Sequence, residues 1–435
     1  MLVLLAPMAV GAEFSHGPYA GAPSRDAVVI SWAAAPLLPA RIEYSPRSTF
    51  ELTGTMHSSI LVPAAQDGDE TPTSHVRLEA LDRSTDYVYR VVLIDEDQET
   101  VSPMGSFSTE PAADQPISFV VLADTQQQSE AVNRLELVGD AIAADPFPMD
   151  FILHAGDLVE EPLQSYWDHW FASFAGMLLR APLIPVLGNH EENHRSYYEA
   201  FSLPPGDGED GKRWWALHWG DAVVVGLDTN VRKAGDYIAQ QHWARTHLAG
   251  PEPHKFVIFH HPVFVSDAAR STGSSLEQTY HPIFVETGVD VVFSGHVHHY
   301  ERIVRDGVTY LVVGGGGATP RSMGLDRVQG SVVSVEGYFF YARVRATSGR
   351  IDVETVSVAE LFPNGTVART EQLLDAFTLS DGLPEENAVF VLEEKAASEE
   401  RVALEENVAF SVWAVVAIAV GVVLGIWALL RAGSA

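Results

Sequence analysis

Apolar and polar residues alternate with a period of two over the first part of the chain. The alternating segments lie between Pro, Gly and Asp residues, at positions 28–32, 40–44, 75–78 and 87–91. Such alternation is typical of β-strands with one buried face, and the residues between the segments are typical of turns. We therefore expect a β-sandwich over residues 18–112.

From residue 116 the pattern changes to short, largely apolar runs, which lie at 117–123, 150–155, 183–187, 255–259 and 291–293. Between them, apolar residues recur every three or four positions, as in amphipathic helices, at 129–144, 165–179, 238–248 and 276–285. Strands that alternate with helices predict an α/β domain, here over residues 116–380. The period of two returns at 339–344 and 351–358, and we expect these segments to complete the second sheet of that domain.

Each apolar run ends in a residue that can bind a metal ion. In chain order these residues are Asp124, Asp157, Asn189 with His190, His260, and His296 with His298. Open α/β sheets place their ligands at the carboxyl ends of strands, so five such ends in succession predict one shared site. A lone His-x-His is as often a surface loop, and the other four strand ends are what favour a metal site. Four further histidines are expected to support the site or to lie on the surface: His154, His194, His261 and His299.

Five sequence blocks contain these residues: Asp-x-Gln, Gly-Asp-x-x, Gly-Asn-His-Glu, His-x-Pro and Gly-His-x-His-x-Tyr-Glu-Arg. In these blocks the chain resembles the calcineurin-like metallophosphoesterases, and among them the purple acid phosphatases and their bacterial relatives, over residues 116–320. The resemblance implies a four-layer α/β/β/α sandwich behind an N-terminal fibronectin type III-like domain. The segment 81–91 is similar to the corner of that domain where a tyrosine fixes the turn into a late strand.

The resemblance also implies a role for each residue of the site. Asp157 would bridge two metal ions, and His190 would stay off the metals and face the scissile phosphate. The first ion would be bound by Asp124 and His298, and the second by Asn189, His260 and His296.

Carboxylate, amide and imidazole donors, in a chain without cysteine, favour Fe, Mn or Zn as the two divalent or trivalent ions. A bridging carboxylate holds two ions about 3.5–4 Å apart, across the attacking and leaving oxygens of an in-line displacement. The expected reaction is attack by a metal-bound hydroxide on a phosphoester, with His190 as the proton donor.

Two positions depart from the family pattern. Gln126 stands where a histidine is common in the wider family, and Glu160 stands where purple acid phosphatases have a metal-binding tyrosine. Both residues are therefore only candidate ligands of the first metal. The glycine run 314–317 lacks the Lys-Ser/Thr of a phosphate-binding loop, so we expect a tight turn near the metals there.

The expected substrate is a small phosphomonoester. A phosphodiesterase on the same metal centre is the alternative among enzymes, and a non-catalytic adhesion or scaffold ectodomain is the alternative from another class. The formal net charge of −31 argues against nucleic-acid partners, because phosphate backbones would be repelled. It also disfavours anionic substrates, unless the metals and nearby arginines reverse the field at the site.

The two ends of the chain predict an exported membrane protein. Residues 1–12 are apolar with small residues at their end, as in a signal peptide, although they lack basic residues. Paired glutamates at 381–407 predict a solvated acidic stalk. The uncharged stretch 408–430 is long enough for a bilayer and carries Trp413 and Trp427 near its ends. We therefore expect a single-pass helix in contact with lipid and a catalytic domain outside the cytoplasm.

Overall fold

The computed structural model describes residues 13–64, 73–96, 98–127, 132–208, 211–230, 234–267, 274–323 and 326–380. The expected signal peptide at 1–12 and transmembrane helix at 408–430 lie outside these ranges. So does the expected stalk at 381–407, except for the backbone of a two-residue strand, β24 (Leu383–Pro384). Among the described helices, none has the length and apolar character needed to span a bilayer.

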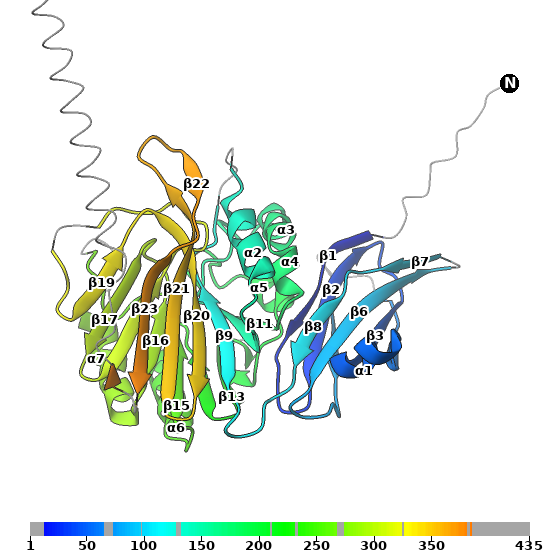
Figure 1. Cartoon of the computed structure of the whole chain (residues 1–435), viewed down its shortest axis with the longest axis horizontal. Coiled ribbons are helices and arrows are strands. Elements are labelled where there is room, and N and C mark those ends of the chain that lie inside the picture. Colours follow the sequence, from blue (N-terminus) through cyan, green and yellow to red (C-terminus); the bar gives the residue numbers. More distant parts are fainter. Residues whose placement is uncertain are drawn as a thin grey trace, which may run out of the picture. The chain divides into compact units, whose positions relative to one another are not determined.

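The N-terminal strands form two antiparallel sheets (Figure 1). One sheet contains β1 (Glu13–Gly21), β2 (Val28–Ala35) and β5 (Thr73–Leu78). The other contains β3 (Ala40–Pro46), β4 (Ser58–Val62), β6 (Asp86–Asp95), β7 (Gln98–Val101) and β8 (Gly105–Ser108), with helix α1 (Arg47–Thr53) after β3. Apolar residues of both sheets, such as Ile30 and Val91, share one core. The segments with a period of two are thus strands of a β-sandwich, because each buries one face against the other sheet.

Tyr87 fixes the turn into β6, as the corner pattern predicted. Its hydroxyl accepts a hydrogen bond from the backbone N–H of Asp82 at 2.9 Å, and its ring stacks on Phe107 with centroids 5.2 Å apart. The sandwich also bonds directly to the domain that follows it. The backbone N–H of Ser106 donates to the carbonyl of Leu179 at 2.8 Å.

The first large sheet begins with three parallel strands: β9 (Ile117–Leu122), β10 (Phe151–His154) and β11 (Leu183–Pro185). Strand β20 (Tyr338–Thr347) pairs with β9 in the antiparallel direction. The sheet continues through β21 (Arg350–Leu361) and β23 (Leu373–Ser380) to β24, and β22 (Val367–Arg369) pairs with β21. The expectation that the segments 339–344 and 351–358 complete the second sheet is therefore wrong. They extend the sheet that β9 begins, here called the β9 sheet, because the free edge of β9 accepts β20.

The second large sheet, here called the β15 sheet, has the strand order β12-β13-β14-β15-β16-β18-β17-β19. Its central strands β14 (Ala222–Gly226), β15 (His254–Ile258), β16 (Val291–Ser294) and β18 (Val308–Val313) run parallel. Antiparallel strands flank them: β12 (Gly206–Asp207), β13 (Trp214–Trp219), β17 (Tyr300–Arg305) and β19 (Ser331–Val335).

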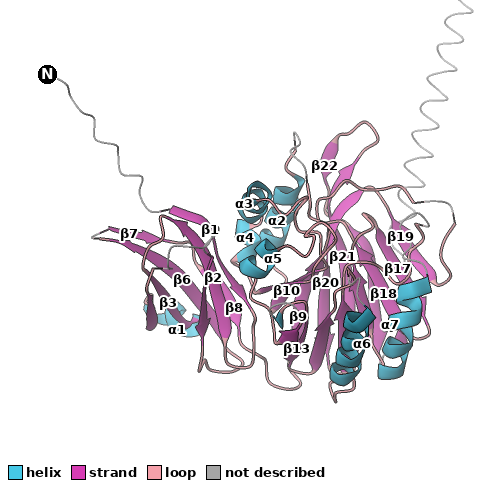
Figure 2. Ribbon diagram, turned by 180° about the vertical axis from the view of Figure 1, so that it is seen from behind, coloured by secondary structure: helices cyan, strands magenta, loops and turns pink. Residues whose placement is uncertain are grey.

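The two sheets pack face to face between two layers of helices (Figure 2). Along β14, Val224 points into the core shared with the β9 sheet, while Val223 and Val225 face helices α6 (Ala234–Leu248) and α7 (Ser274–Thr287). The opposite helical layer covers the β9 sheet and contains α2 (Arg134–Ala144), α3 (Gln164–Ser173), α4 (Ala175–Leu178) and α5 (Arg195–Ala200). Strands β9, β10, β14 and β16 are buried along their whole length, because both of their faces are covered, and they read as largely apolar runs, whereas β21 alternates in burial. The order of layers is α/β/β/α.

Candidate metal centre

Two buried carboxylates lie side by side just beyond β9 and β10. Asp124 and Asp157 are 0% and 1% exposed, and their backbones adopt the left-handed conformation with φ of 57° and 56°. Close packing leaves no room for a side chain beside them. A Cβ on Gly188 would lie 2.1 Å from Asp157 Oδ1, and one on Gly295 would lie 2.5 Å from Asp124 Oδ2. The glycines of the sequence blocks therefore let the backbone approach the carboxylates.

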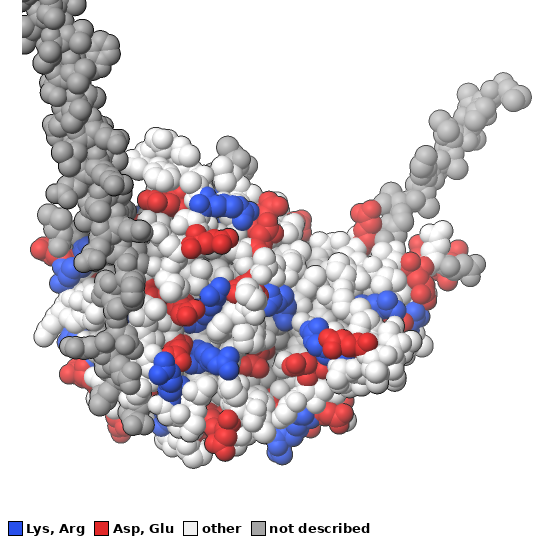
Figure 3. Space-filling model, in the orientation of Figure 1, with Lys and Arg blue, Asp and Glu red and all other residues white. Residues whose placement is uncertain are grey.

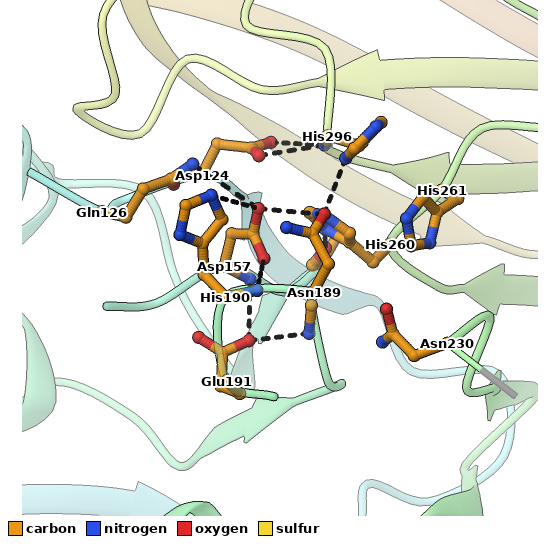
Figure 4. A network of polar contacts seen from close by, with 12 residues as sticks. Asp124, Gln126, Asp157, Asn189, His190, Glu191, Asn230, His260, His261 and His296 are labelled. Carbon is orange, nitrogen blue, oxygen red and sulfur yellow. Dashed lines mark hydrogen bonds and ion pairs between the residues drawn. The ribbon is translucent and has the colours of Figure 1, made fainter. Parts of the chain in front are cut away.

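Four donor atoms from four strand ends converge around His260 (Figure 4). His260 Nε2 lies 3.0 Å from Asp157 Oδ2, 3.2 Å from Asn189 Oδ1 and 3.3 Å from His296 Nδ1. These are the four residues expected around the second metal ion. One carboxylate, one amide oxygen and two imidazoles suit Fe, Mn or Zn.

The residues expected around the first metal ion also meet. His298 Nε2 lies 3.6 Å from Asp124 Oδ1 and 3.3 Å from Gln126 Nε2. Gln126 Nε2 is in turn 3.5 Å from Asp157 Oδ2. The amide oxygen of Gln126 is buried without a hydrogen-bond partner among the described residues. Rotating this amide by half a turn places its oxygen among these donors, so Gln126 fits a metal ion as an oxygen ligand.

Backbone carbonyls orient three of the imidazoles. His260 Nδ1 donates to Ala155 O at 2.9 Å, His298 Nδ1 donates to Thr319 O at 2.8 Å, and His190 Nδ1 donates to Glu160 O at 2.7 Å. A carbonyl can only accept, so each bond keeps the proton on Nδ1 and leaves the lone pair of the neutral ring on Nε2. This arrangement is usual for metal-binding histidines.

The pKa values of Asp124, Asp157 and His260 depend on one another, because these groups are buried close together. Burial raises the pKa of Asp124, and the nearby carboxylate of Asp157 adds to the effect. Burial would also raise the pKa of Asp157, but His260 and His190 outweigh it and hold this pKa below its usual value. Burial would lower the pKa of His260, but Asp157 outweighs it and raises the pKa to about 9. Acidic oxygens so deeply buried need positive charge close by, and two metal ions would supply it.

Glu191 supports the cluster, although the sequence pattern predicts no role for it beyond membership of the Gly-Asn-His-Glu block. Its carboxylate is fully buried and accepts the backbone N–H groups of Gly188 and Leu158, both at 2.7 Å, and of Asp157 at 3.0 Å. It thereby ties the loop after β10 to the loop after β11. The signal that could have revealed this role was an acidic residue directly after the candidate site residues Asn189 and His190.

His190 lies beside the cluster and reaches into solvent. Its Nε2 is 3.9 Å from Asp157 Oδ2, and its side chain is 32% exposed. Burial lowers the pKa of His190, but Asp157 outweighs that effect, and the pKa is raised overall. His261 was expected to support the site or to lie on the surface, and its ring nitrogen falls within 4.8 Å of those of His260 and His296. Its Nδ1 lies 2.9 Å from Thr229 Oγ1.

A cavity of about 430 Å³ opens beside the first group of donors. Gln126, Glu160, His190 and His298 line it, and its lining residues all lie between positions 126 and 321. The N-terminal sandwich thus contributes none of them. Glu160 lines the wall of the cavity together with His298. It remains a candidate ligand.

Two further sequence features of the site are structural. The glycine turn at 314–317 packs on Asp124, with the N–H of Gly316 donating to Ala123 O at 2.8 Å. In the last sequence block, Tyr300 and Arg302 bind a different carboxylate. The Tyr300 hydroxyl and Arg302 Nε both donate to Asp375 Oδ2 at 2.7 Å. The end of that block therefore fastens the β15 sheet to the β9 sheet.

On the face drawn in Figure 3, Lys and Arg side chains are interspersed with Asp and Glu and do not gather into one basic area. This agrees with the excess of acidic residues in the chain, 58 against 27 basic ones.

Comparisons with known proteins agree with this geometry. Residues 117–300 match the family described as Calcineurin-like phosphoesterase. An uncharacterized protein of Mycobacterium tuberculosis is 28% identical over 281 residues, which cover 55% of this chain and 52% of that protein. Purple acid phosphatase 15 of Arabidopsis thaliana is 25% identical over 292 residues, covering 56% of this chain and 53% of that protein. The chain thus spans about half the length of the curated relatives it matches.

A solved structure shares the fold over more of the chain. The purple acid phosphatase from yellow lupin (Lupinus luteus) seeds superposes with a TM-score of 0.67 at 16% identity, covering 86% of this chain and 77% of that one. At this identity the likeness shows the fold alone. The family match, the curated relatives and the set of donors agree with one another. The chain therefore contains a calcineurin-like phosphoesterase domain and is homologous to purple acid phosphatases.

Proposed function

We propose that this chain is a metal-dependent phosphoesterase with two metal ions, and that it hydrolyses phosphomonoesters. The observation that carries the proposal is the convergence of two buried carboxylates, an amide and three imidazoles beside an open cavity that His190 also lines. A non-catalytic ectodomain would need neither the cavity nor a histidine at its wall.

The donors divide between two ions. Asp124 and His298, with Gln126 or Glu160 as further candidates, would hold the first ion. Asn189, His260 and His296 would hold the second, and Asp157 would bridge both. Bound there, Fe, Mn or Zn ions would lower the pKa of water and neutralise the charge of a phosphate group.

The chain's own residues prepare the rest of the reaction. The bond from Nδ1 to Glu160 O fixes the ring of His190, so that Nε2 faces the cluster and the cavity. In its protonated form His190 can donate from Nε2 to the oxygen of the departing alcohol. The left-handed backbones of Asp124 and Asp157 keep both carboxylates at the ends of their strands, so the site needs little rearrangement on binding.

The proposal is tested by metal analysis of the purified protein together with hydrolysis of para-nitrophenyl phosphate, bis(para-nitrophenyl) phosphate and glycerol phosphate. We expect two metal ions per chain and a higher kcat/KM for the monoesters. His190→Ala should keep both metals and lower kcat for glycerol phosphate by about 10²–10⁴-fold, the usual range for a lost general acid. The loss should be smaller for para-nitrophenyl phosphate, whose leaving group needs no proton.

His57→Ala, an exposed histidine of the N-terminal sandwich, is the matched control and should behave as wild type. A metal-loaded protein that hydrolyses none of the three esters would refute the proposal. Preference for the diester would favour the phosphodiesterase instead, and equal losses for both monoesters would remove the proton-donor role.

We also propose that residues 408–430 anchor the protein as a single-pass helix, with the catalytic domain outside the cytoplasm. An uncharged stretch of this length, with a tryptophan toward each end, supports the proposal. Truncation before Val408 should move an active enzyme from the membrane fraction to the soluble fraction. A full-length protein that fractionates as soluble would contradict it.

A further inference from the structure

The cavity beside the metal centre carries more positive charge than the chain as a whole would predict. The chain has 27 basic and 58 acidic residues, yet two arginines, Arg134 and Arg321, line this one cavity of about 430 Å³. The acidic residue in the lining is Glu160, whose carbonyl binds His190. Neither the phosphate group nor the metal ions require these arginines for the chemical step, so their guanidinium groups can contact another part of the substrate.

Arg134 is buried. It is the first residue of α2 and is only 4% exposed. Its guanidinium carbon lies 5.6 Å from the centroid of the Phe339 ring. Its backbone N–H donates to the side-chain oxygen of Gln127 at 2.8 Å, and Gln127 lines the same cavity. The contact with the Phe339 ring restrains the guanidinium group, and a planar guanidinium can bind an oxyanion through two parallel hydrogen bonds.

Arg321 is exposed and is attached to the metal-binding residues themselves. Its backbone N–H donates to the carbonyl of His298 at 3.1 Å. Ala318, three residues earlier, donates its N–H to the carbonyl of Asp124 at 2.9 Å. The backbone of the segment 318–321 is thus bonded to Asp124 and His298. It places the cationic side chain of Arg321 at the cavity, next to the first group of donors.

We propose that the substrate carries a second anionic group on its leaving alcohol, a carboxylate or a second phosphate, and that Arg134 and Arg321 bind it. This inference rests on the proposed phosphoesterase function and names the class of its substrate. Guanidinium groups match both kinds of oxyanion in geometry. In a strongly acidic protein, two arginines at the cavity also restore a local field that attracts such a substrate. Both residues are specificity-determining and take no part in the chemical step.

The test compares three alkyl phosphates that differ in one group: glycerol phosphate, phosphoglycerate and glycerol bisphosphate. We expect kcat/KM to be at least about tenfold higher for one or both of the doubly anionic substrates, as for one added charge-assisted hydrogen bond. If phosphoglycerate is the better of these two substrates, the second group is a carboxylate. If glycerol bisphosphate is better, the second group is a phosphate. Arg321→Gln and Arg134→Gln should each remove most of this preference through KM. The kcat/KM of each variant is expressed relative to its own value for glycerol phosphate, so that the preference is measured as a ratio within one variant.

Arg77→Gln, which removes a half-exposed arginine of the N-terminal sandwich, is the matched control and should leave the preference unchanged. Because Arg134 is buried and its replacement can destabilise the fold, the exposed Arg321 decides the outcome if Arg134→Gln fails to fold. Calorimetry adds a readout without turnover. Phosphonopropionate should bind the wild type more tightly than propylphosphonate, and Arg321→Gln should erase the difference.

Equal kcat/KM for the three substrates in an enzyme that hydrolyses para-nitrophenyl phosphate would overturn this inference and leave the proposed function standing. A preference that survives both arginine substitutions would also overturn it. Absence of hydrolysis of every ester, para-nitrophenyl phosphate included, would overturn the proposed function and this inference with it.

Discussion

The two sheets of the phosphoesterase domain bring different chemistry to the candidate metal centre. The β9 sheet contributes oxygen donors, namely Asp124, Asp157 and Asn189. The β15 sheet contributes nitrogen donors, namely His260, His296 and His298. The carboxylates and the imidazoles are also oriented by different backbone groups. Backbone N–H groups bind the carboxylates, since His296 N lies 2.8 Å from Asp124 Oδ2 and His190 N lies 2.8 Å from Asp157 Oδ1. Carbonyl groups bind the imidazoles.

Several of these bonds cross from one sheet to the other. The N–H of His296, on the β15 sheet, binds Asp124 on the β9 sheet. The carbonyl of Ala155, after β10, binds His260 after β15. Each sheet therefore orients donors that the other one provides. It follows that neither half is prepared for metal binding alone, and that the site forms when the two sheets pack together.

The largest effect is expected at Asp157, whose carboxylate lies beside donors from both sheets. Asp157→Asn removes the charge of the carboxylate that lies within 3.0 Å of His260 and 3.5 Å of Gln126, yet keeps its size. We expect loss of at least one metal ion and a fall in kcat/KM of about 10³-fold or more, beyond the ~10–100-fold cost of a supporting residue. Metal content by mass spectrometry and para-nitrophenyl phosphate hydrolysis measure both.

Asp140→Asn on α2, whose side chain is 61% exposed, is the matched control and should leave both quantities unchanged. If Asp157→Asn retained two metal ions and a rate near that of wild type, Asp157 would not be the bridge.

A smaller effect is expected from a substitution that weakens only the support of the oxygen donors on the β9 sheet. Glu191→Gln replaces an acceptor oxygen with a donor NH₂ group facing the N–H groups of Gly188, Leu158 and Asp157. We expect a loss of about 10–100-fold in kcat/KM, as for other supporting residues of metal sites. The free energy of unfolding should fall by about 1–3 kcal/mol, because buried donors are left unpaired.

Glu286→Gln on α7, with a side chain that is 67% exposed, controls for the loss of one charge. Activity and urea unfolding should be measured on both variants. Unchanged activity in Glu191→Gln would show that the loops after β10 and β11 keep their positions without the Glu191 carboxylate, held by the histidines of the β15 sheet.

The smallest effect is expected from converting one oxygen donor into a nitrogen donor. Gln126→His adds an imidazole next to His298 and should tighten the first metal site by about tenfold, because imidazole is a better ligand than a neutral amide for Fe or Zn. Competition with a chelator measures the affinity, with the exposed Gln115→His as control. Identical affinities in wild type and Gln126→His would place Gln126 outside the ligand shell.

The candidate donors can be recognised in the sequence because metal binding constrains residue type and position at the end of each strand. A carboxylate, amide or imidazole directly after a buried apolar run is a local feature, and Asp124, Asp157, Asn189, His260 and His296 are each visible in this way. The same holds for the β-sandwich and for the alternation of strands and helices, since periodicity is set by neighbours in the sequence.

Other features depend on contacts between distant segments, which a single sequence does not record. The strands after Tyr338 join the β9 sheet because β20 pairs with the free edge of β9, more than 200 residues earlier in the chain. Tyr300 and Arg302 belong to the same block as His296, yet they bind Asp375 and not the site. Glu191 and Arg134 gain their roles from what surrounds them once folded. Local sequence thus determined which residues can bind metal, and only packing decided which atoms face each other, because direction and distance are properties of the assembled sheets.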